Sequence, residues 1–179
     1  VLTLVMALAV LEAVSELLSQ GCYIKWPNDI VVNGKKVCGI LTEMSAELDQ
    51  IHYVVIGAGI NVNQETLAPE IQETATSICI ERGQQTNRAE LTARVLYYFE
   101  KNYAVFEKGW DFSGLVEKYN QFLVNRDRQV RVLDPKGAYD GIARGINEKG
   151  ELLVEQLSDG AIVQVYAGEV SVRGIYGYV

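Results

Sequence analysis

The dipeptide Asn33-Gly34 limits how this chain can fold more than any other feature. It stands between two apolar runs, residues 30–32 and residues 35–41. Asn and Gly both tolerate positive φ, so this pattern is the strongest short-range signal for a β-hairpin. We therefore expect two antiparallel strands here, and we expect the second to continue through residues 42–48.

A second apolar and β-branched run, residues 53–56, predicts a buried central strand. It leads into Gly57-Ala58-Gly59, which is interpreted as a turn whose backbone N–H groups could face a phosphate. Val62 stands where a dinucleotide-binding G-x-G-x-x-G motif has its third glycine, so a Rossmann-type site is disfavoured. Taken by itself, the turn that ends at Asn61 is more often structural than functional.

Helical patterns occur on both sides of these strands. Apolar residues at helical spacing from residue 4 to residue 18 predict an amphipathic helix packed on a sheet. Asn87, with Glu90 three residues later, predicts the capped start of a long helix that ends near Gly109. Shorter helices are expected over residues 69–74 and 113–123.

The last fifty residues have a different character. Short apolar runs alternate with turns there, which predicts a small barrel or sandwich built from five strands. The expected strands are residues 130–133, 141–146, 152–156, 162–166 and 170–174.

Charge and cysteine content exclude several classes of protein. The formal net charge of −7 repels phosphate backbones, so we expect no nucleic-acid surface on this chain. Cys22, Cys38 and Cys79 lack metal-ligand spacing and His52 is the only histidine, which favours buried thiols in a reducing compartment over a zinc site. Glutamates interrupt the apolar start before it reaches the length of a membrane span.

Two lysines flank the hairpin and receive different interpretations. Lys25 precedes the block Trp26-Pro27-Asn28-Asp29, which suits a strand-to-turn junction, and we expect Lys25 to be structural or to support the site from behind the residues that touch the ligand. Lys36 precedes an apolar strand, and spacing alone favours a solvated lysine at a strand edge. Gly39 inside that strand indicates close approach by a ligand or another backbone.

Three blocks of this sequence, in this order and spacing, resemble the biotin–protein ligases. They are Lys-Trp-Pro-Asn-Asp at residues 25–29, residues 34–43 and residues 55–63, and residues 75–77 and 167–174 also fit. The chain is identified as a member of that family over essentially its whole length. The resemblance implies an α+β fold. It places a truncated class II synthetase-like mixed sheet with packed helices in residues 1–125 and a small SH3-like β-barrel in residues 126–179.

The same resemblance implies an ATP-dependent ligase that works in the cytoplasm. Such enzymes form biotinyl-adenylate from biotin and ATP, with Mg²⁺, and pass the biotinyl group to a lysine of a biotin carboxyl carrier domain. Lys36 matches the catalytic lysine, which offsets the repulsion between the biotin carboxylate and the α-phosphate. The biotin pocket is implied to be formed by Lys36 and by the backbone of Gly39, Ile40, Leu41, Gly57, Ala58 and Gly59. The nucleotide is implied to contact Lys36, Asn28, Asn61 and Arg173, and Asp29 to contact the metal.

One part of the family pattern does not occur in these residues. The family has a Gly/Arg-rich biotin loop (G-R-G-R-x-x-R), and this sequence opens in the helix that follows it. We therefore expect the N-terminal part of the catalytic domain to be missing, and the chain by itself to bind biotin poorly and to have little or no ligase activity.

Two alternatives remain open at this point. One is a lipoate–protein ligase-like enzyme, which shares the acyl-adenylate chemistry. The other is a non-catalytic dimerisation or binding fragment that forms a homodimer through the sheet edge near residues 42–48. Some family members also carry an N-terminal DNA-binding domain, and this sequence does not decide whether one accompanies it.

Overall fold

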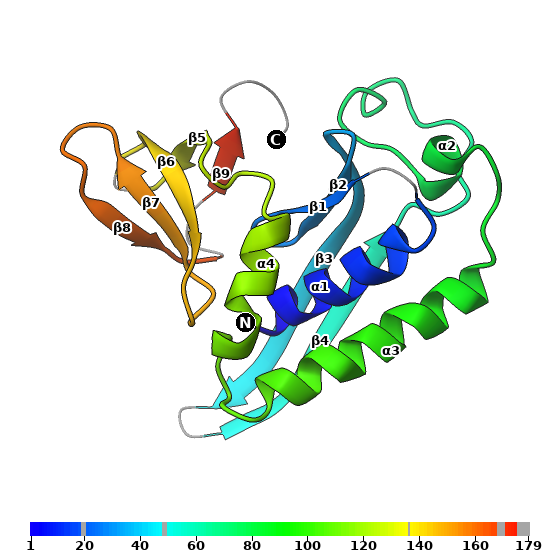
Figure 1. Cartoon of the computed structure of the whole chain (residues 1–179), viewed down its shortest axis with the longest axis horizontal. Coiled ribbons are helices and arrows are strands. Elements are labelled where there is room, and N and C mark those ends of the chain that lie inside the picture. The colour runs from blue at the N-terminus through cyan, green and yellow to red at the C-terminus, as the bar shows by residue number, and fades with distance from the viewer. Residues whose placement is uncertain (19–20, 48–49, 136, 168–170, 175–179) are drawn as a thin grey trace.

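Two antiparallel sheets, with helices beside and between them, organise the chain (Figure 1). The computed structural model describes residues 1–18, 21–47, 50–135 and 137–167, together with the backbone of residues 171–174. The first sheet has the strand order β1-β2-β3-β4 and the second the order β8-β7-β6-β5-β9. Every pairing between described strands is antiparallel, so these strands do not form the expected mixed sheet. Two isolated bridges, Ile24 to Leu123 and Lys36 to Ala75, are parallel.

The first sheet is built on the predicted hairpin. Asn33 and Gly34 form its turn, with φ of 50° and 76°, as the sequence predicts. The strand before the turn is short and the strand after it is long. The sheet therefore has four strands near the hairpin turn and only two strands at its far end. Its strands are β1 (Cys22–Lys25), β2 (Asp29–Val32), β3 (Lys35–Glu47) and β4 (Gln50–Ile60).

The register separates the two faces of this sheet. Ile24, Ile30 and Cys38 lie opposite one another on β1, β2 and β3, and all three are buried. The neighbouring row therefore points to the other face, because successive residues of a strand alternate. That row consists of Lys25, Asp29, Gly39 and Gly59.

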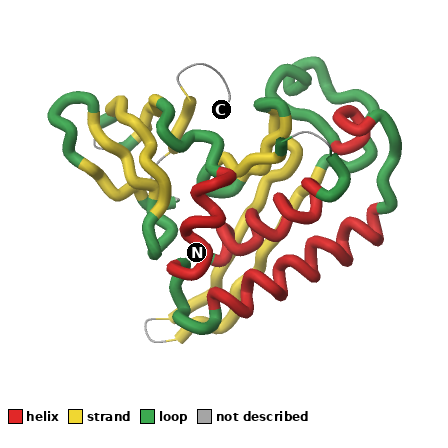
Figure 2. The backbone as a smooth tube through the Cα atoms, in the orientation of Figure 1, coloured by secondary structure: helices red, strands yellow, loops and turns green. Residues whose placement is uncertain are grey.

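Helix α1 (Leu2–Ser15) covers the inner face, which carries Ile24, Ile30 and Cys38, and a second helix packs on α1. Helix α1 packs against the sheet on one side and against α3 (Arg88–Phe106) on the other (Figures 1 and 2). The hydroxyl of Thr3 on α1 donates to the hydroxyl of Thr42 on β3 at 2.9 Å. The prediction of an amphipathic helix is therefore wrong in one respect, because ten of the fourteen residues of α1 are buried. Covered on both sides, this helix has no solvated face.

The prediction for residues 53–56 is also wrong. Strand β4 stands at the end of the strand order, and Tyr53 and Val55 are 61% and 52% exposed. A β-branched run fits a strand with one covered face as well as one with two, and here Ile56 packs on the core while its neighbours do not. Gly57-Ala58-Gly59 is not a turn but the last part of β4.

A long connection between β4 and α3 lies at one end of the molecule, at the upper right of Figure 2. The helix expected over residues 69–74 is absent, and this stretch forms successive turns instead. Ser77 caps the short helix α2 (Ile78–Arg82) by accepting from the Ile80 N–H at 3.0 Å. Asn87 caps α3 as predicted, accepting from the N–H groups of Ala89 and Glu90.

The predicted C-terminal strands are confirmed in number and order. They follow a short 3₁₀ turn, η1 (Ser113–Leu115), and the helix α4 (Val116–Phe122), which contacts both β1 and β6. The indole N–H of Trp26 donates to the Gly150 carbonyl at 3.0 Å and links the two sheets. The strands are β5 (Gln129–Leu133), β6 (Tyr139–Ile146), β7 (Leu152–Gln156), β8 (Ile162–Val165) and β9 (Ser171–Gly174).

Candidate active site

The outer face of the first sheet brings the predicted site residues into one row. Lys25, Asp29, Gly39 and Gly59 are direct neighbours on β1, β2, β3 and β4. Three of them were assigned to the site from the sequence, and Lys25 was not. The sequence could not place Lys25 here, because cross-strand neighbours depend on register and not on distance along the chain.

Lys36 is held over this row by an ion pair. Its Nζ lies 2.6 Å from Oδ1 of Asp29, and the two side chains are 37% and 13% exposed. A Cβ on Gly39 would lie 2.9 Å from both Cε and Nζ of Lys36. The absence of a side chain at Gly39 therefore lets the lysine lie flat against β3 and reach Asp29.

The backbone of Lys36 is fixed independently of its side chain. Its N–H donates to the Thr74 carbonyl and its carbonyl accepts from the Thr76 N–H, each at 2.8 Å. A bulge between Ile30 and Val31 shifts the register of β2 just before Val31 faces Lys36. Two backbone hydrogen bonds thus hold the main chain from which the Lys36 side chain extends.

A side-chain-free floor extends from Lys36 along β3 and β4. Gly39 faces Gly59, and Gly57 faces Leu41, whose side chain is 64% exposed. A Cβ on Gly57 or Gly59 would meet only carbonyl oxygens, at 3.8 and 3.7 Å, which is ordinary contact. Neither glycine has a positive φ, so neither the backbone conformation nor the packing of the fold requires glycine there.

Ile40 and Ala58 belong to the opposite face. They face each other between the two glycine rows, and the Ile40 side chain is buried in the core. Asn28 occupies both backbone groups of Ile40, since its carbonyl accepts from the Ile40 N–H and its amide donates to the Ile40 carbonyl, each at 2.9 Å. Ile40 and Ala58 can line a site only through main chain.

Asn61 and Arg173 occupy different positions relative to this row. Asn61 continues β4 by donating its N–H to the Val37 carbonyl, and its side-chain amide donates to the Thr76 carbonyl at 3.0 Å. It therefore lies next to the segment that fixes Lys36. Arg173 lies opposite Arg131 in the second sheet, and its side chain is outside the described residues, as are residues 168–170 of the last matching block.

The thiols take no part in this site. Burial raises the pKa of Cys22 and of Cys38 to about 12, so both remain protonated at neutral pH. Within the described ranges, no group of three or more His, Cys, Asp or Glu side chains is placed to bind a metal ion. None of the described helices combines the length and the apolar character that crossing a membrane would need.

The arrangement suits a ligand that is both flat and anionic. The glycine floor lets a planar group lie against main chain, and Leu41 offers an apolar edge. The Lys36 ammonium supplies positive charge at one end of that floor. A carboxylate or a phosphate is the chemistry that a lysine in this position recognises.

Comparisons with known proteins find related sequences for two parts of the chain. The Biotin/lipoate A/B protein ligase family matches residues 1–61, and the Biotin protein ligase C terminal domain matches residues 127–173. The bifunctional ligase/repressor BirA of Bacillus subtilis is 36% identical over 171 residues, which cover 94% of this chain and 52% of that protein. The chain thus spans about half the length of this curated relative.

Solved structures are similar over more of their length. The apo structure of biotin protein ligase from Aquifex aeolicus has a TM-score of 0.85 and 31% identity, covering 97% of this chain and 74% of that chain. The structure of the same ligase in complex with biotin and ATP has a TM-score of 0.82 and 31% identity. The match covers 97% of this chain and 71% of that chain. The α+β fold with two antiparallel sheets is therefore shared with these ligases.

Proposed function

The chain belongs to the biotin–protein ligase family, and we propose that it provides the lysine and the floor of a site that joins biotin to ATP. The product would be biotinyl-adenylate, from which the biotinyl group passes to a lysine of a biotin carboxyl carrier domain. The observation that carries this proposal is the Lys36 ammonium, 2.6 Å from Asp29 and beside the glycine pair Gly39–Gly59.

The first step brings two anions together. A carboxylate oxygen of biotin attacks the α-phosphorus of ATP, the bond to the bridging oxygen breaks, and pyrophosphate leaves. Lys36 can offset both the repulsion between the reactants and the charge that develops on the phosphorus oxygens. In the second step the carrier amine attacks the acyl carbon, AMP leaves, and the amine loses a proton.

The floor residues position the substrate for this step. The backbone of Gly39, Gly57 and Gly59 lets the biotin rings lie against the strands, with Leu41 at their edge. Ile40 and Ala58 contribute main chain only, because their side chains point to the other face. Asn28, Asn61 and Arg173 are proposed to contact the nucleotide.

The use of ATP implies a magnesium ion. Asp29 belongs to no group of three or more His, Cys, Asp or Glu side chains within the described residues, and its Oδ1 lies 2.6 Å from Nζ of Lys36. This donor set does not fit a magnesium site held by the protein, because Mg²⁺ prefers six oxygen ligands and is commonly bound through substrate phosphates. Metal binding by Asp29 stays a prediction.

The outer face of the first sheet is open to solvent, which limits how tightly residues 1–179 can bind a ligand there. Leu41 and Val55 are 64% and 52% exposed, so a ligand on this floor would be covered on one side only. Ligand sites normally bury 70–90% or more of a ligand of about this size. We therefore propose that this polypeptide by itself binds biotin weakly and has little ligase activity.

Several finer assignments are part of the same proposal. They are a class II synthetase-like arrangement for residues 1–125, an SH3-like barrel for residues 126–179, a cytoplasmic location, and a homodimer through sheet edges as a possible assembly. Strand β3 runs past the end of β2, so the edge of residues 42–47 on that side pairs with no described strand. Sedimentation of a strict monomer at high concentration would argue against the homodimer.

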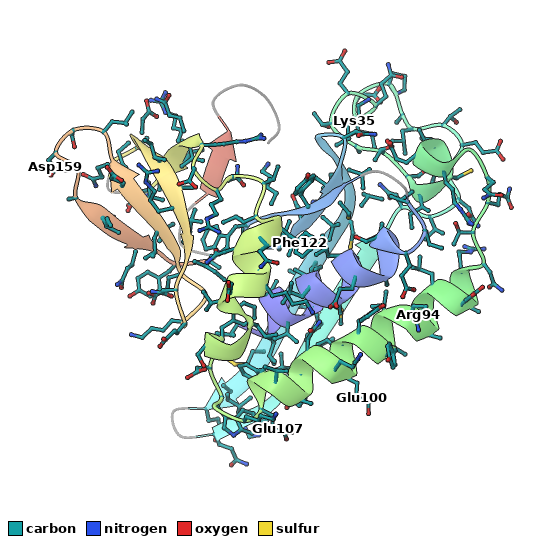
Figure 3. The ribbon with its side chains drawn as sticks, in the orientation of Figure 1. Lys35, Arg94, Glu100, Glu107, Phe122 and Asp159 are labelled. Atoms are coloured by element: carbon teal, nitrogen blue, oxygen red, sulfur yellow. The ribbon has the colours of Figure 1, made fainter. Side chains whose placement is uncertain are left out.

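Binding measurements with matched variants test the function. Lys36→Met removes the proposed cation, and Lys35→Met removes the adjacent lysine, whose Nζ donates to the Gln72 carbonyl at 2.9 Å at the end of the hairpin (Figure 3). A charge-assisted hydrogen bond contributes about 1.5–3 kcal/mol, so Lys36→Met should weaken binding of biotinyl-adenylate roughly 10- to 100-fold. Lys35→Met should change it less than about 2-fold, in line with an exposed surface contact.

The same titrations separate the alternatives. Absence of biotinyl-adenylate binding, or equal losses in both variants, would contradict the proposal. Tighter binding of lipoyl-adenylate than of biotinyl-adenylate would favour a lipoate–protein ligase. Sub-micromolar binding of biotin by the unaltered chain would overturn the proposed weak binding.

A further inference from the structure

The turn between β6 and β7, residues 147–150, links the second sheet to the rest of the molecule. Its last carbonyl, that of Gly150, accepts from the indole N–H of Trp26 in a buried hydrogen bond. The Glu148 carbonyl of the same turn accepts from the N–H of Phe112, which is fully buried just before η1. Two carbonyl groups of this turn therefore bind partners outside the second sheet.

Asn147 fixes the shape of the turn from within. Its side-chain oxygen accepts from the N–H groups of Lys149 and Glu151, at 3.0 and 3.1 Å. Its side-chain amide donates to the Glu151 carboxylate at 2.7 Å, and Glu151 is only 5% exposed. The N–H of Gly150 also donates to the Asn147 carbonyl, at 2.9 Å. These hydrogen bonds hold the Gly150 carbonyl in one orientation.

Gly150 lies too close to α1 to carry a side chain without a rearrangement. Its φ is 78°, and an added Cβ would lie 2.5 Å from Cδ1 of Leu4. Leu4 belongs to α1 and to the buried core. Figure 1 shows the turn beside the N-terminal end of this helix. The position of the Gly150 carbonyl is therefore set by the core as well as by the turn.

Trp26 stands at the start of the segment that carries the site. It is 2% exposed, and the indole N–H is its only side-chain donor. Two residues later, Asn28 binds both backbone groups of Ile40. Ile40 is flanked in β3 by Gly39 and Leu41, which form part of the floor. A change in the position of Trp26 is therefore expected to change the position of the floor.

The same segment leads to the proposed catalytic lysine. Asp29 follows Asn28, and its Oδ1 lies 2.6 Å from Nζ of Lys36. A site that brings two reactants together must hold its groups to within about 0.5 Å, and residues behind those that touch the ligand supply this precision. The segment from Trp26 to Asp29 is fixed at one end by the second sheet and contacts Lys36 at the other.

We propose that Trp26 and the turn of residues 147–150 position the Lys36 site. The turn fixes Trp26, Trp26 fixes the segment that ends at Asp29, and this segment sets the place of the Lys36 ammonium over the floor. Trp26 and Asn147 are thus positioning residues that touch no substrate. This inference rests on the proposed function, since it assumes that Lys36 binds the reacting anions.

Titrations with biotinyl-adenylate test this role from both ends of the contact. Asn147→Ala loosens the turn and leaves the first sheet unaltered, and Trp26→Phe removes the indole N–H. Each variant should weaken binding about 3- to 30-fold, the usual range for residues that act on a site through others. Gly141→Ala is the control, because it strains the second sheet at Glu155, away from the turn. Its folded fraction should bind within about 2-fold of the unaltered chain.

A double-mutant cycle shows whether the effect reaches the ligand through Lys36. Lys36→Met, Trp26→Phe and the double variant are titrated with the same ligand. In the Lys36→Met background, the loss caused by Trp26→Phe should be at least about 3-fold smaller than in the unaltered chain, because the ammonium that Trp26 positions is gone.

The indole signals provide a readout that a loss of stability does not move. The chain has two tryptophans, and the second, Trp110, is 67% exposed. A proton–nitrogen correlation spectrum therefore contains two indole signals, which Trp110→Phe assigns. Biotinyl-adenylate should shift the Trp26 signal and leave the Trp110 signal in place, because coupling between two sites is reciprocal.

The remaining outcomes would overturn the positioning role. Equal binding losses in Gly141→Ala and Asn147→Ala would show that lost stability accounts for the effect. Equal losses from Trp26→Phe with and without Lys36, or an unshifted Trp26 signal at saturation, would show that Trp26 does not act on the lysine. Unchanged binding by Asn147→Ala would exclude the turn and leave the proposed function intact. An unaltered chain that does not bind biotinyl-adenylate would refute the proposed function and this inference together.

Discussion

Gly59→Ala should separate ligand binding from stability. Gly59 lies in β4 opposite Gly39, and an added Cβ would find its nearest heavy atom, the Gly39 carbonyl oxygen, at 3.7 Å. The methyl group would point away from the core, toward the open face that carries Lys25 and Asp29. The fold has room for this group, and a ligand lying on the floor does not.

The substitution should leave the stability of the fold equal or higher and should weaken ligand binding. At a backbone conformation that alanine adopts without strain, Gly→Ala stabilises a protein by about 0.4–1 kcal/mol, because the unfolded chain loses freedom. A methyl group forced into a close-packed contact costs about 1–3 kcal/mol. The free energy of unfolding of Gly59→Ala should therefore stay equal or rise, while ligand binding weakens roughly 5- to 150-fold.

Urea unfolding and titration with biotinyl-adenylate measure these two quantities, with Gly141→Ala as the control. A Cβ on Gly141 would meet the Val154 side chain and lie 2.7 Å from the Glu155 carbonyl oxygen, so the backbone must shift. This variant should lose about 1–3 kcal/mol of stability, while its folded fraction binds the ligand normally. A Gly59→Ala variant that binds as well as the unaltered chain would refute the glycine floor, and so would one that loses stability.

Three further outcomes follow from contacts away from the floor. Trp26→Phe should lower the free energy of unfolding by about 1–3 kcal/mol in urea, because the buried Gly150 carbonyl loses its donor; an unchanged midpoint would contradict this. The Arg94 guanidinium lowers the pKa of Glu16 to about 2, so Glu16 should add stability that is present above pH 4.5 and lost as the pH falls toward 2; Glu16→Gln should flatten acid unfolding curves over that window. Since burial raises the pKa of Cys38 to about 12, the folded chain should resist alkylation of this thiol at pH 8, and rapid labelling without unfolding would count against it.

Structural features that depend on residues close together in the sequence were predicted correctly. The Asn33-Gly34 turn and the Asn87 cap each depend on a few adjacent residues, whose side chains or φ values decide the local structure. The five C-terminal strands were found because regular turns separate them. In these cases local preference and the final fold agree.

Errors arose where tertiary packing decides the outcome. Glu12 lies in helix α1 and Glu16 follows its last residue as the C-cap, and in the sequence both interrupt the apolar run. Both carboxylates pair instead with side chains of the neighbouring helices, Glu12 with Lys118 at 2.8 Å and Glu16 with Arg94. Charge in a sequence therefore did not distinguish a solvated face from a helix interface.

The misassigned Gly57-Ala58-Gly59 is more informative than the other errors. Glycine weakens a strand by roughly 0.5–1 kcal/mol relative to alanine, which is why these residues were interpreted as a turn. The structure shows them in β4 without a positive φ and without a close neighbour that would exclude a Cβ. Among the described residues, no contact at Gly57 or Gly59 offsets that destabilisation. Residues that disagree with their local structure and gain nothing from packing are expected where a protein meets a ligand. The glycines that were wrongly interpreted as a turn are therefore stronger evidence for a ligand-binding floor than a correctly predicted turn would have been.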